Sequence, residues 1–529
     1  MAQETVTHLP PLVSAMLQKE FYPDQPSSVE LKQTHISYVF LAGQYVYKVK
    51  KPVCFAFLDY STLERRLHFC REEVRLNRRL APDTYVGVVS ICRDESGLVL
   101  REEPSNDPSA AVEYAVKMRL LPEERMLSRL LVEGRVGKED IRSIVRRLVP
   151  FHQSAGTLRA ATHGAPEAIR QQVTENFDET RQFVGLTIGS KLFQRLRDYS
   201  LDFLSAHAEL LDARVRDERV REGHGDLRAE HICLTDEITV FDCIEFSEKL
   251  RTCDVASEVA FLAMDLDFLN ASELSEELAG GYAETAQDRS LTALLPFYKS
   301  YRAHVRGKVE SLKSREVEVP KRERKGALIR AQRYFFLAER YVRGTPRPAI
   351  LIVCGLVATG KSTVARMLGD ATGFPLLSSD VVRKRLAHLP PTGRTAAGYR
   401  EGIYSESFTR STYQKLLEEA EKPLRAGRGV IIDATFKDPA HRRLFLDSAA
   451  SAGVPAFFIE CRAGEEEILR RLQEREESGD GVSDATRQVY LRQRGEFTPL
   501  TDIPDRLHLT VDTESGLFES IENVLEALR

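Results

Sequence analysis

Residues 355–363 read Gly-Leu-Val-Ala-Thr-Gly-Lys-Ser-Thr, and this stretch decides the fold of the chain around it. Four residues separate the two glycines, and a lysine and two hydroxyl residues follow, which is the pattern of a phosphate-binding loop. The apolar run at 349–354 predicts a buried strand before the loop, and residues 363–368 predict a helix after it. The pattern therefore stands at a strand-to-helix junction, where backbone N–H groups point toward a bound phosphate. The flanking strand and helix argue against the alternative, a glycine-rich turn followed by a chance lysine.

Each residue of the loop pattern predicts its own contact with a nucleotide. Gly355 and Gly360 let the backbone wrap a triphosphate, and Lys361 reaches the β and γ phosphates. The hydroxyl of Ser362 is expected to hold Mg²⁺, and Thr363 completes the nucleotide-binding set. The cofactors expected for this site are ATP and Mg²⁺.

The length and composition of the chain indicate a multidomain globular protein. Its 529 residues correspond to three or four compact units at about 150 residues each. Hydrophobic residues make up 42%, charged residues 29%, and the net charge is −4, which argues against a nucleic-acid-binding surface or an acidic tail. No signal-peptide pattern and no membrane-spanning apolar run is found, so we expect a cytoplasmic protein without a membrane partner. The eight cysteines include no Cys-x-x-Cys pair, which argues against a zinc site or a disulfide framework.

Further apolar segments after the loop predict a parallel sheet. These segments are 374–380, 429–433, 454–460 and 507–512. Helical stretches separate them, and this alternation is typical of an α/β fold in which ligands bind at the carboxyl ends of the strands. Asp433 closes one of these segments and is expected to orient Mg²⁺ through water.

Asp380 closes another of these segments and is a candidate catalytic base. A carboxylate at a strand end can accept a proton from an acceptor hydroxyl. Arg383 follows one helical turn later and is placed to hold an anionic group of the substrate. The alternative for Asp380 is a helix N-cap, a role that one residue can combine with catalysis.

Residues 347–529 resemble the small P-loop kinases that include zeta toxins, gluconate kinase and the kinase module of polynucleotide kinases. The resemblance is carried by the loop, Ser378-Ser-Asp380-x-x-Arg383, Ile432-Asp433-Ala-Thr435 and Arg470-Arg-Leu-Gln-Glu-Arg475. In those kinases a mobile lid places arginines over the transferring phosphoryl group, which implies nucleotide contacts for Arg471 or Arg475. Helical spacing equally allows these arginines to pair with Glu467 and Glu474.

A second constellation lies in the first half of the chain. It consists of His224-Gly-Asp226-Leu-Arg-Ala-Glu-His231-Ile-Cys-Leu234 and Val240-Phe-Asp242-Cys-Ile-Glu-Phe246. These segments resemble the catalytic loop and the metal-binding segment of the protein-kinase-like fold, in its aminoglycoside and choline phosphotransferase branch. The resemblance implies that Asp226 orients the acceptor hydroxyl and that Asp242 binds the metal. The family usually has Asn where this chain has His231, which can ligate a metal only when neutral and favours a softer ion such as Mn²⁺.

The segment Val46-Tyr-Lys48-Val-Lys-Lys51 alternates like a strand and resembles the one that supplies the ATP-pairing lysine. Glu73 looks like the helix partner that fixes Lys48 on the α and β phosphates. Lys50 lies on the same strand face as Lys48, so either lysine is a candidate for the phosphate contact. The family's glycine-rich loop is missing, and Gly43 is expected to form a hairpin turn instead. Asp254 resembles the aspartate that braces the catalytic loop of this family.

Together these motifs predict a fused protein with an α+β part and an α/β part. The predicted parts are an N-terminal extension at 1–24, a two-lobed aminoglycoside phosphotransferase-like kinase domain at 25–315, a charged helical connector at 316–346, and a P-loop kinase domain at 347–529, with a parallel sheet flanked by helices. In the leading interpretation both modules are ATP-dependent kinases that phosphorylate a hydroxyl of a small molecule. Asp226 and Asp380 are then the two bases, and a nucleic-acid end is a less favoured acceptor.

Two other functions stay open. The N-terminal module is, in the first alternative, a binding or regulatory domain that serves one active kinase, as His231 and the missing glycine-rich loop suggest. In the second alternative the P-loop belongs to a toxin-like or switch ATPase without a small-molecule acceptor. The spacing of Asp380 and Arg383 favours an acceptor pocket instead.

Overall fold

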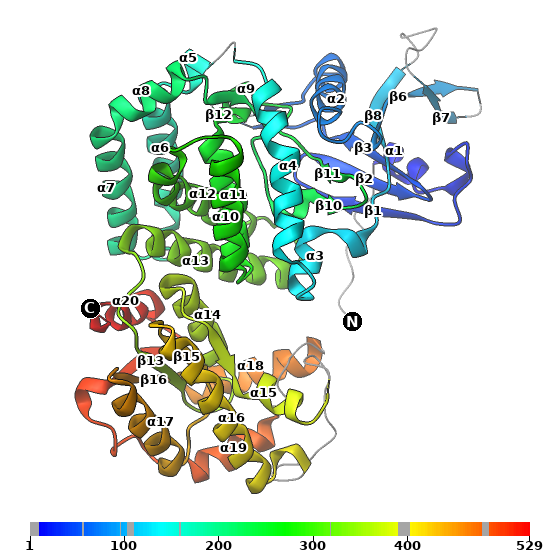
Figure 1. Ribbon diagram of the computed structural model, residues 1–529. Coiled ribbons are helices and arrows are strands. Elements are labelled where there is room, and N and C mark those ends of the chain that lie inside the picture. The colour runs from blue at the N-terminus through cyan, green and yellow to red at the C-terminus, as the bar shows by residue number, and fades with distance from the viewer. Residues whose placement is uncertain are drawn as a thin grey trace. The chain divides into compact units, whose positions relative to one another are not determined.

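The computed structural model describes residues 10–55, 58–95, 97–102, 111–157, 160–317, 319–389, 402–478 and 486–528 (Figure 1). The chain divides into two compact units, which are residues 1–174 with 201–302 and residues 175–200 with 303–529. This division falls inside three helices, α6 (Pro166–Thr180), α7 (Ser190–Ala206) and α12 (Leu291–Lys313). The motifs predict boundaries after residues 24, 315 and 346. These boundaries divide the chain by its sequence motifs and not by its compact units, and they remain a prediction.

The first unit begins with an antiparallel sheet of six strands in the order β1-β2-β3-β8-β6-β7. The strands are β1 (Val29–Gln33), β2 (Ser37–Ala42), β3 (Tyr45–Lys50), β6 (Tyr85–Asp94), β7 (Gly97–Glu102) and β8 (Ala111–Arg119). Side chains alternate between the two faces of each strand. One face packs on α1 (Pro11–Met16) through residues such as Phe40 and Tyr47. The other face packs on α2 (Leu63–Asn77) through residues such as Tyr114 and Val116, so this face and α2 frame the lysines of β3.

Two tight turns join the first three strands. Gly43 has a φ of +62° between the paired residues Ala42 and Tyr45, which confirms the predicted hairpin turn. The turn between β1 and β2 contains only residues 34–36, and the Thr34 hydroxyl accepts a hydrogen bond from the Ser37 N–H at 3.0 Å. A short turn therefore joins β1 and β2, at the position where the resemblance to the protein-kinase-like fold leads one to look for a glycine-rich loop.

The rest of the first unit is mainly helical. Its centre is α10 (Val255–Phe268), in which every residue is buried. In Figure 1 this helix lies beside α11 (Ser272–Thr285), which also contacts α4 (Lys138–Ser154). Other helices are α3 (Leu127–Val132), α5 (Ala160–His163), α8 (Ala208–Arg216) and α9 (Glu248–Arg251). Short paired strands are β4 (Cys54–Phe55) with β5 (Leu58–Asp59), β9 (Val220–Glu222) with β12 (Thr252–Asp254), and β10 (Ile232–Leu234) with β11 (Ile238–Val240).

The second unit contains a five-stranded parallel sheet in the order β14-β15-β13-β16-β17. Its strands are β13 (Ile350–Cys354), β14 (Leu376–Ser378), β15 (Val430–Asp433), β16 (Ala456–Arg462) and β17 (His508–Asp512). Each apolar segment predicted as a strand supplies one of them. The predicted fold class, with an α/β part and an α+β part, is confirmed.

Helices cover both faces of this sheet. Residues such as Ile432 pack on α16 (Glu406–Arg425) and α17 (Pro439–Ala452). The alternate residue Ile431 faces Gly369 of α14 (Lys361–Thr372) on the opposite side. Other helices of this unit are α15 (Ser379–Leu386), α18 (Glu465–Ser478), α19 (Arg487–Glu496) and α20 (Leu517–Ala527). No helix in the described parts of the chain is long and apolar enough to cross a membrane.

The long helix α13 (Lys321–Arg343) belongs to the same unit and packs along α14. The Arg333 guanidinium forms two hydrogen bonds with Asp370 of α14, at 2.7 and 3.0 Å. Phe336 packs against Phe518 of α20, with ring centroids 6.4 Å apart. The segment predicted as a charged helical connector thus contributes an apolar face to the core around the P-loop helix.

Candidate active sites

The P-loop has the backbone that its glycines predict. Gly355 has a φ of +129°, and a Cβ atom there would lie 2.6 Å from the Cys461 carbonyl oxygen, so a larger residue does not fit. Gly360 has a φ of +89° and directly precedes α14. The Lys361 ammonium donates a hydrogen bond to the Leu356 carbonyl at 2.6 Å, and burial lowers the pKa of Lys361. The Lys361 ammonium therefore lies against the backbone of its own loop, and from there it would reach a phosphate bound by the loop.

Two oxygen ligands meet beside the loop. The Ser362 hydroxyl donates a hydrogen bond to the Asp433 carboxylate at 2.7 Å. Asp433 is buried and pairs in register with Val353, two residues before the loop. Among the described residues no group of three or more His, Cys, Asp or Glu side chains is arranged to hold a metal. Mg²⁺ needs no such group, because it usually keeps several waters and binds one or two protein oxygens together with phosphates.

Asp380 lies at the carboxyl end of the neighbouring strand. Ser378 of β14 pairs with Asp433, and Asp380 follows as the second residue of α15. Ser378 occupies the N-cap position, so the alternative that Asp380 is the N-cap is wrong. Burial raises the pKa of Asp380, and the negative charge of Asp433 raises it further. A raised pKa makes the carboxylate a stronger proton acceptor.

Arg383 is buried near the start of α16. Its guanidinium donates hydrogen bonds to the Ile403 carbonyl at 2.6 Å and to the Thr409 hydroxyl at 3.2 Å. It also lies over the Tyr404 ring, 5.1 Å from the centroid. Its Nε has no partner among the described residues. The contact with an anionic substrate group remains a prediction.

Arg471 connects α18 to the P-loop. It pairs with Glu467 at 2.6 Å, as helical spacing allows, and donates hydrogen bonds to the Ala358 carbonyl at 3.3 Å and the Thr513 carbonyl at 2.8 Å. Arg475 belongs to α18, but its side chain lies outside the described residues. Thr513, whose hydroxyl donates to the Thr359 carbonyl at 2.7 Å, was not predicted, because nothing in its local sequence marks it. A lid role over the phosphoryl group remains a prediction for both arginines.

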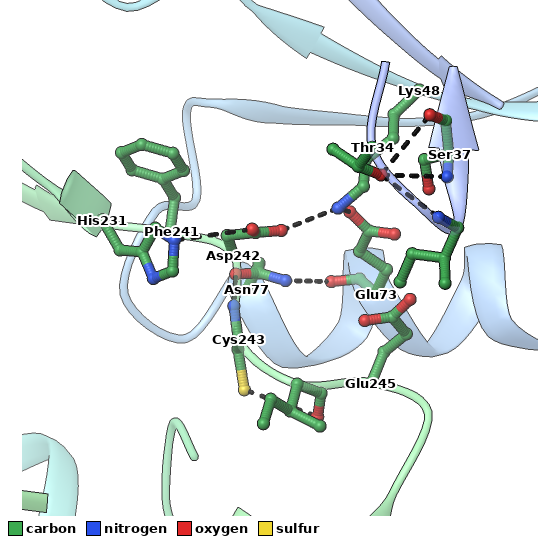
Figure 2. A network of polar contacts seen from close by, with 12 residues as sticks. Thr34, Ser37, Lys48, Glu73, Asn77, His231, Phe241, Asp242, Cys243 and Glu245 are labelled. Atoms are coloured by element: carbon green, nitrogen blue, oxygen red, sulfur yellow. Dashed lines mark hydrogen bonds and ion pairs between the residues drawn. The ribbon is translucent and has the colours of Figure 1, made fainter. Parts of the chain in front are cut away.

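The first unit brings together the predicted lysine, glutamate and metal-binding aspartate (Figure 2). The Lys48 ammonium lies 2.9 Å from Glu73 and 2.7 Å from Asp242. Burial acts to lower the pKa of Lys48, but Asp242 and Glu73 outweigh it and hold that pKa well above its usual range. Burial likewise opposes ionisation of Asp242, but Lys48 keeps the pKa of Asp242 well below its usual range. Lys48 and Asp242 are therefore both charged at neutral pH.

An unpredicted arginine contacts the proposed catalytic base. The Arg228 guanidinium forms hydrogen bonds with both Asp226 oxygens, at 3.0 and 3.1 Å. The spacing of two residues was the only sequence signal for this contact. Asp226 therefore has a cationic partner. The Arg228 guanidinium can neutralise the Asp226 carboxylate, or it can stabilise the negative charge of a transferred group.

Glu258 holds the backbone of the predicted catalytic loop in place. Its carboxylate accepts hydrogen bonds from the backbone N–H groups of His224, at 2.8 Å, and of Gly225. Asp254 instead caps α10 and pairs with the buried Arg214. The expectation that Asp254 braces the loop is therefore wrong, because its carboxylate is occupied by the start of α10 and by Arg214.

His231 has the orientation of a metal ligand. Its Nδ1 lies 2.8 Å from the Asp226 carbonyl oxygen, which can only accept, so Nδ1 carries the proton. Nε2 lies 3.7 Å from the Asp242 carboxylate and 3.6 Å from the Glu230 carboxylate, and it offers a lone pair to a metal whenever the ring is neutral. Metal-ligating histidines commonly donate the other ring N–H to a backbone carbonyl in this way. The residues present fit a divalent ion between His231 and Asp242.

The second unit is a P-loop nucleotide-binding domain, because the loop, Ser362 and Asp433 lie together at the carboxyl ends of parallel strands. A family model described as "AAA domain" matches residues 350–500, which contain this loop and most of this sheet. The match confirms the resemblance predicted for the C-terminal part of the chain.

Two mycobacterial proteins resemble the chain over most of its length. The uncharacterized proteins Rv2004c of Mycobacterium tuberculosis (strain ATCC 25618 / H37Rv) and Mb2027c of Mycobacterium bovis are each 31% identical to it over 470 residues. The matched region covers 88% of this chain and 89% of each relative. The chain therefore belongs to the same family as these two proteins.

Several solved kinase structures are similar to parts of the chain. A choline/ethanolamine kinase family protein from Mesorhizobium loti covers 63% of this chain and 99% of its own, with 14% identity and a TM-score of 0.37. A putative kinase from Chloroflexus aurantiacus covers 35% of this chain and 98% of its own, with 23% identity and a TM-score of 0.29. A gluconokinase from Sinorhizobium meliloti covers 35% and 93%, with 16% identity and a TM-score of 0.26.

Proposed function

We propose that the protein is an ATP-dependent kinase with two active modules, each of which transfers a phosphoryl group to a hydroxyl of a small molecule. The observation that supports the proposal is that one chain holds two separate groups of polar and charged side chains, each suited to binding phosphate and a divalent ion. In the second unit, Ser362 and Asp433 meet beside the P-loop. In the first unit, Lys48 is held between Glu73 and Asp242.

In the P-loop module each polar or charged residue has a separate role in phosphoryl transfer. Lys361 leaves the Leu356 carbonyl to bind the β and γ phosphates, and Ser362 and Asp433 hold Mg²⁺. Asp380 accepts the proton of the acceptor hydroxyl as that hydroxyl attacks the γ phosphorus, and ADP leaves. Arg383 binds an anionic part of the acceptor.

Asp380→Asn is expected to lower phosphoryl transfer in the P-loop module roughly a hundredfold or more, because the amide cannot accept the proton. The affinity for ATP should change little, since the loop contacts do not involve Asp380. Transfer from labelled ATP across a panel of hydroxyl-bearing metabolites measures the first effect, and calorimetry measures the second. The matched control is Asp447→Asn, which changes an exposed carboxylate on α17. An unchanged transfer rate in Asp380→Asn would rule out its role as base.

In the N-terminal module, Lys48 would release Asp242 and bind the α and β phosphates of the nucleotide. Asp226 orients the acceptor hydroxyl, and Arg228 lies beside it to stabilise negative charge. His231 and Asp242 would hold the divalent ion, which draws charge from the phosphates when bound.

The imidazole of His231 predicts a preference of the N-terminal module for Mn²⁺ over Mg²⁺, because nitrogen ligands favour the softer ion. In the Lys361→Ala background, which silences the P-loop module, turnover should be faster with Mn²⁺. His231→Asn should remove this preference, since an amide oxygen suits Mg²⁺. Steady-state turnover with each ion measures the ratio of the two rates. Equal rates with both ions before and after the substitution would mean that His231 does not ligate the metal.

The second candidate function, a regulatory N-terminal module, is favoured by one observation. Lys48 and Arg228 neutralise Asp242 and Asp226, the two carboxylates that transfer would need. A module of this kind would bind nucleotide without turnover. Turnover by Lys361→Ala protein distinguishes the two functions.

A further inference from the structure

A second buried lysine lies beside the nucleotide lysine of the first unit. The Lys50 ammonium contacts Glu73 at 2.7 Å, the Tyr60 hydroxyl at 3.3 Å, and the Glu245 carboxylate. Tyr60 also donates a hydrogen bond to Glu245. The three partners come from α2, from the segment after β5, and from the segment that follows Asp242. Lys50 therefore ties the sheet to the helix and to the metal-binding segment.

The two lysines form parallel ion pairs with one segment of the chain. Lys48 contacts Asp242 and Lys50 contacts Glu245, while the two oxygens of Glu73 are divided between the lysines. Figure 2 shows Glu73 and Glu245 on the same side of β3 as Lys48. Glu73 consequently keeps a cationic partner when either lysine moves away.

The two ion pairs differ in exposure. The side chains of Lys48 and Asp242 are 13% and 42% exposed, whereas those of Lys50 and Glu245 are 0% and 5% exposed. A buried pair is costly to separate, because each partner is left as an unpaired charge away from water. The Lys48–Asp242 pair borders solvent. A phosphate can therefore replace Asp242 as the partner of Lys48, and a metal ion can replace Lys48 as the partner of Asp242. The Lys50–Glu245 pair has no such route.

We propose that Lys50 and Glu245 are positioning residues for the N-terminal nucleotide site. Their buried pair fixes Glu73 and the metal-binding segment, so that Lys48 alone exchanges its carboxylate partner for the phosphates of the nucleotide. The proposal rests on the proposed function of this module. It also answers which lysine contacts phosphate: Lys48 does, and Lys50 acts through Glu73.

A double-mutant cycle in the full-length Lys361→Ala protein tests the proposal. The variants are Lys48→Met, Lys50→Met and the combination, and the readout is the dissociation constant of a non-hydrolysable ATP analogue measured by calorimetry. Lys48→Met should weaken binding roughly tenfold to a hundredfold, because a charged hydrogen bond to phosphate is lost. Lys50→Met should weaken it by a similar factor when Lys48 is present, and by less than about twofold when Lys48 is already Met. A residue with only a general structural role would weaken binding by the same factor in both backgrounds.

Two further variants keep the test decisive. Lys32→Met removes an exposed lysine of β1 and should leave the affinity unchanged. If Lys50→Met does not fold, as judged by its unfolding midpoint, Glu245→Gln replaces it, and this neutral isostere should show the same dependence on Lys48. Equal losses in the two backgrounds, or no loss from Lys48→Met, would overturn the positioning role while leaving the site itself in place. A Lys361→Ala parent that binds no analogue would instead overturn the proposed N-terminal site, and the positioning role with it.

Discussion

Lys361→Ala is expected to lower ATP turnover at the P-loop roughly a thousandfold or more. In the proposed mechanism the Lys361 ammonium stabilises the negative charge on the β and γ phosphates in the transition state, and alanine removes this interaction. In the free protein the ammonium is already held at the mouth of the loop by the Leu356 carbonyl. The measurement is steady-state turnover in the Lys48→Met background, in which only the P-loop module is expected to turn over ATP.

The control for this prediction is Lys415→Ala, which removes a partly exposed lysine of α16 that pairs only with the neighbouring Glu418 among the contacts described. Its turnover should equal that of the parent. The unfolding midpoint of Lys361→Ala reports whether the fold survives the loss of a buried side chain. Turnover that persists at the parental rate in folded Lys361→Ala protein would place the activity elsewhere.

Removal of α13 is expected to abolish cooperative folding of the P-loop module. The helix buries an apolar group consisting of Ala331, Tyr334, Phe335, Phe336, Leu337 and Ala338. Arg333 is also the ion-pair partner of Asp370 on the P-loop helix. Burial raises the pKa of Asp370 to about 6 despite this pair. A fragment of residues 347–529 would lose these apolar contacts and the Arg333 partner of Asp370.

Chemical denaturation of two fragments checks this prediction. The fragment 303–529 retains α13 and should unfold in a cooperative transition, whereas 347–529 should unfold without one or aggregate. Because the folded pKa of Asp370 is raised, its contribution to stability is present at low pH and is lost as pH rises through about 6. A cooperative transition of 347–529 at the same midpoint as 303–529 would show that α13 is only a linker.

Much of the P-loop module could be predicted from the sequence, because its signals are local. Buried strands can be recognised in the sequence as short apolar runs. Because ligands bind at the carboxyl ends of parallel strands, Asp433 could be predicted to lie beside Ser362. Asp380 shows the limit of this reasoning. Its segment was predicted to end at Asp380, but the strand ends at Ser378 and a helix begins at once, because propensities define element boundaries poorly.

Contacts between distant segments could not be predicted. Lys50 and Glu245 are 195 positions apart, and no spacing rule relates them. The role of Glu258 was assigned to Asp254, because both are acidic residues near the start of the same helix and only the fold decides which carboxylate reaches the loop. The first turns of α13 are rich in charged residues, and this pattern predicts a connector. The apolar residues at 334–337, which the helix buries, come only later in the same helix.

The central claim is that one chain carries two independent nucleotide sites. Calorimetric titration of the full-length protein with a non-hydrolysable ATP analogue, in the presence of Mn²⁺ and Mg²⁺, tests it most directly. We expect two equivalents to bind to the wild type and one to Lys361→Ala. A wild type that binds a single equivalent, with none left in Lys361→Ala, would contradict the claim.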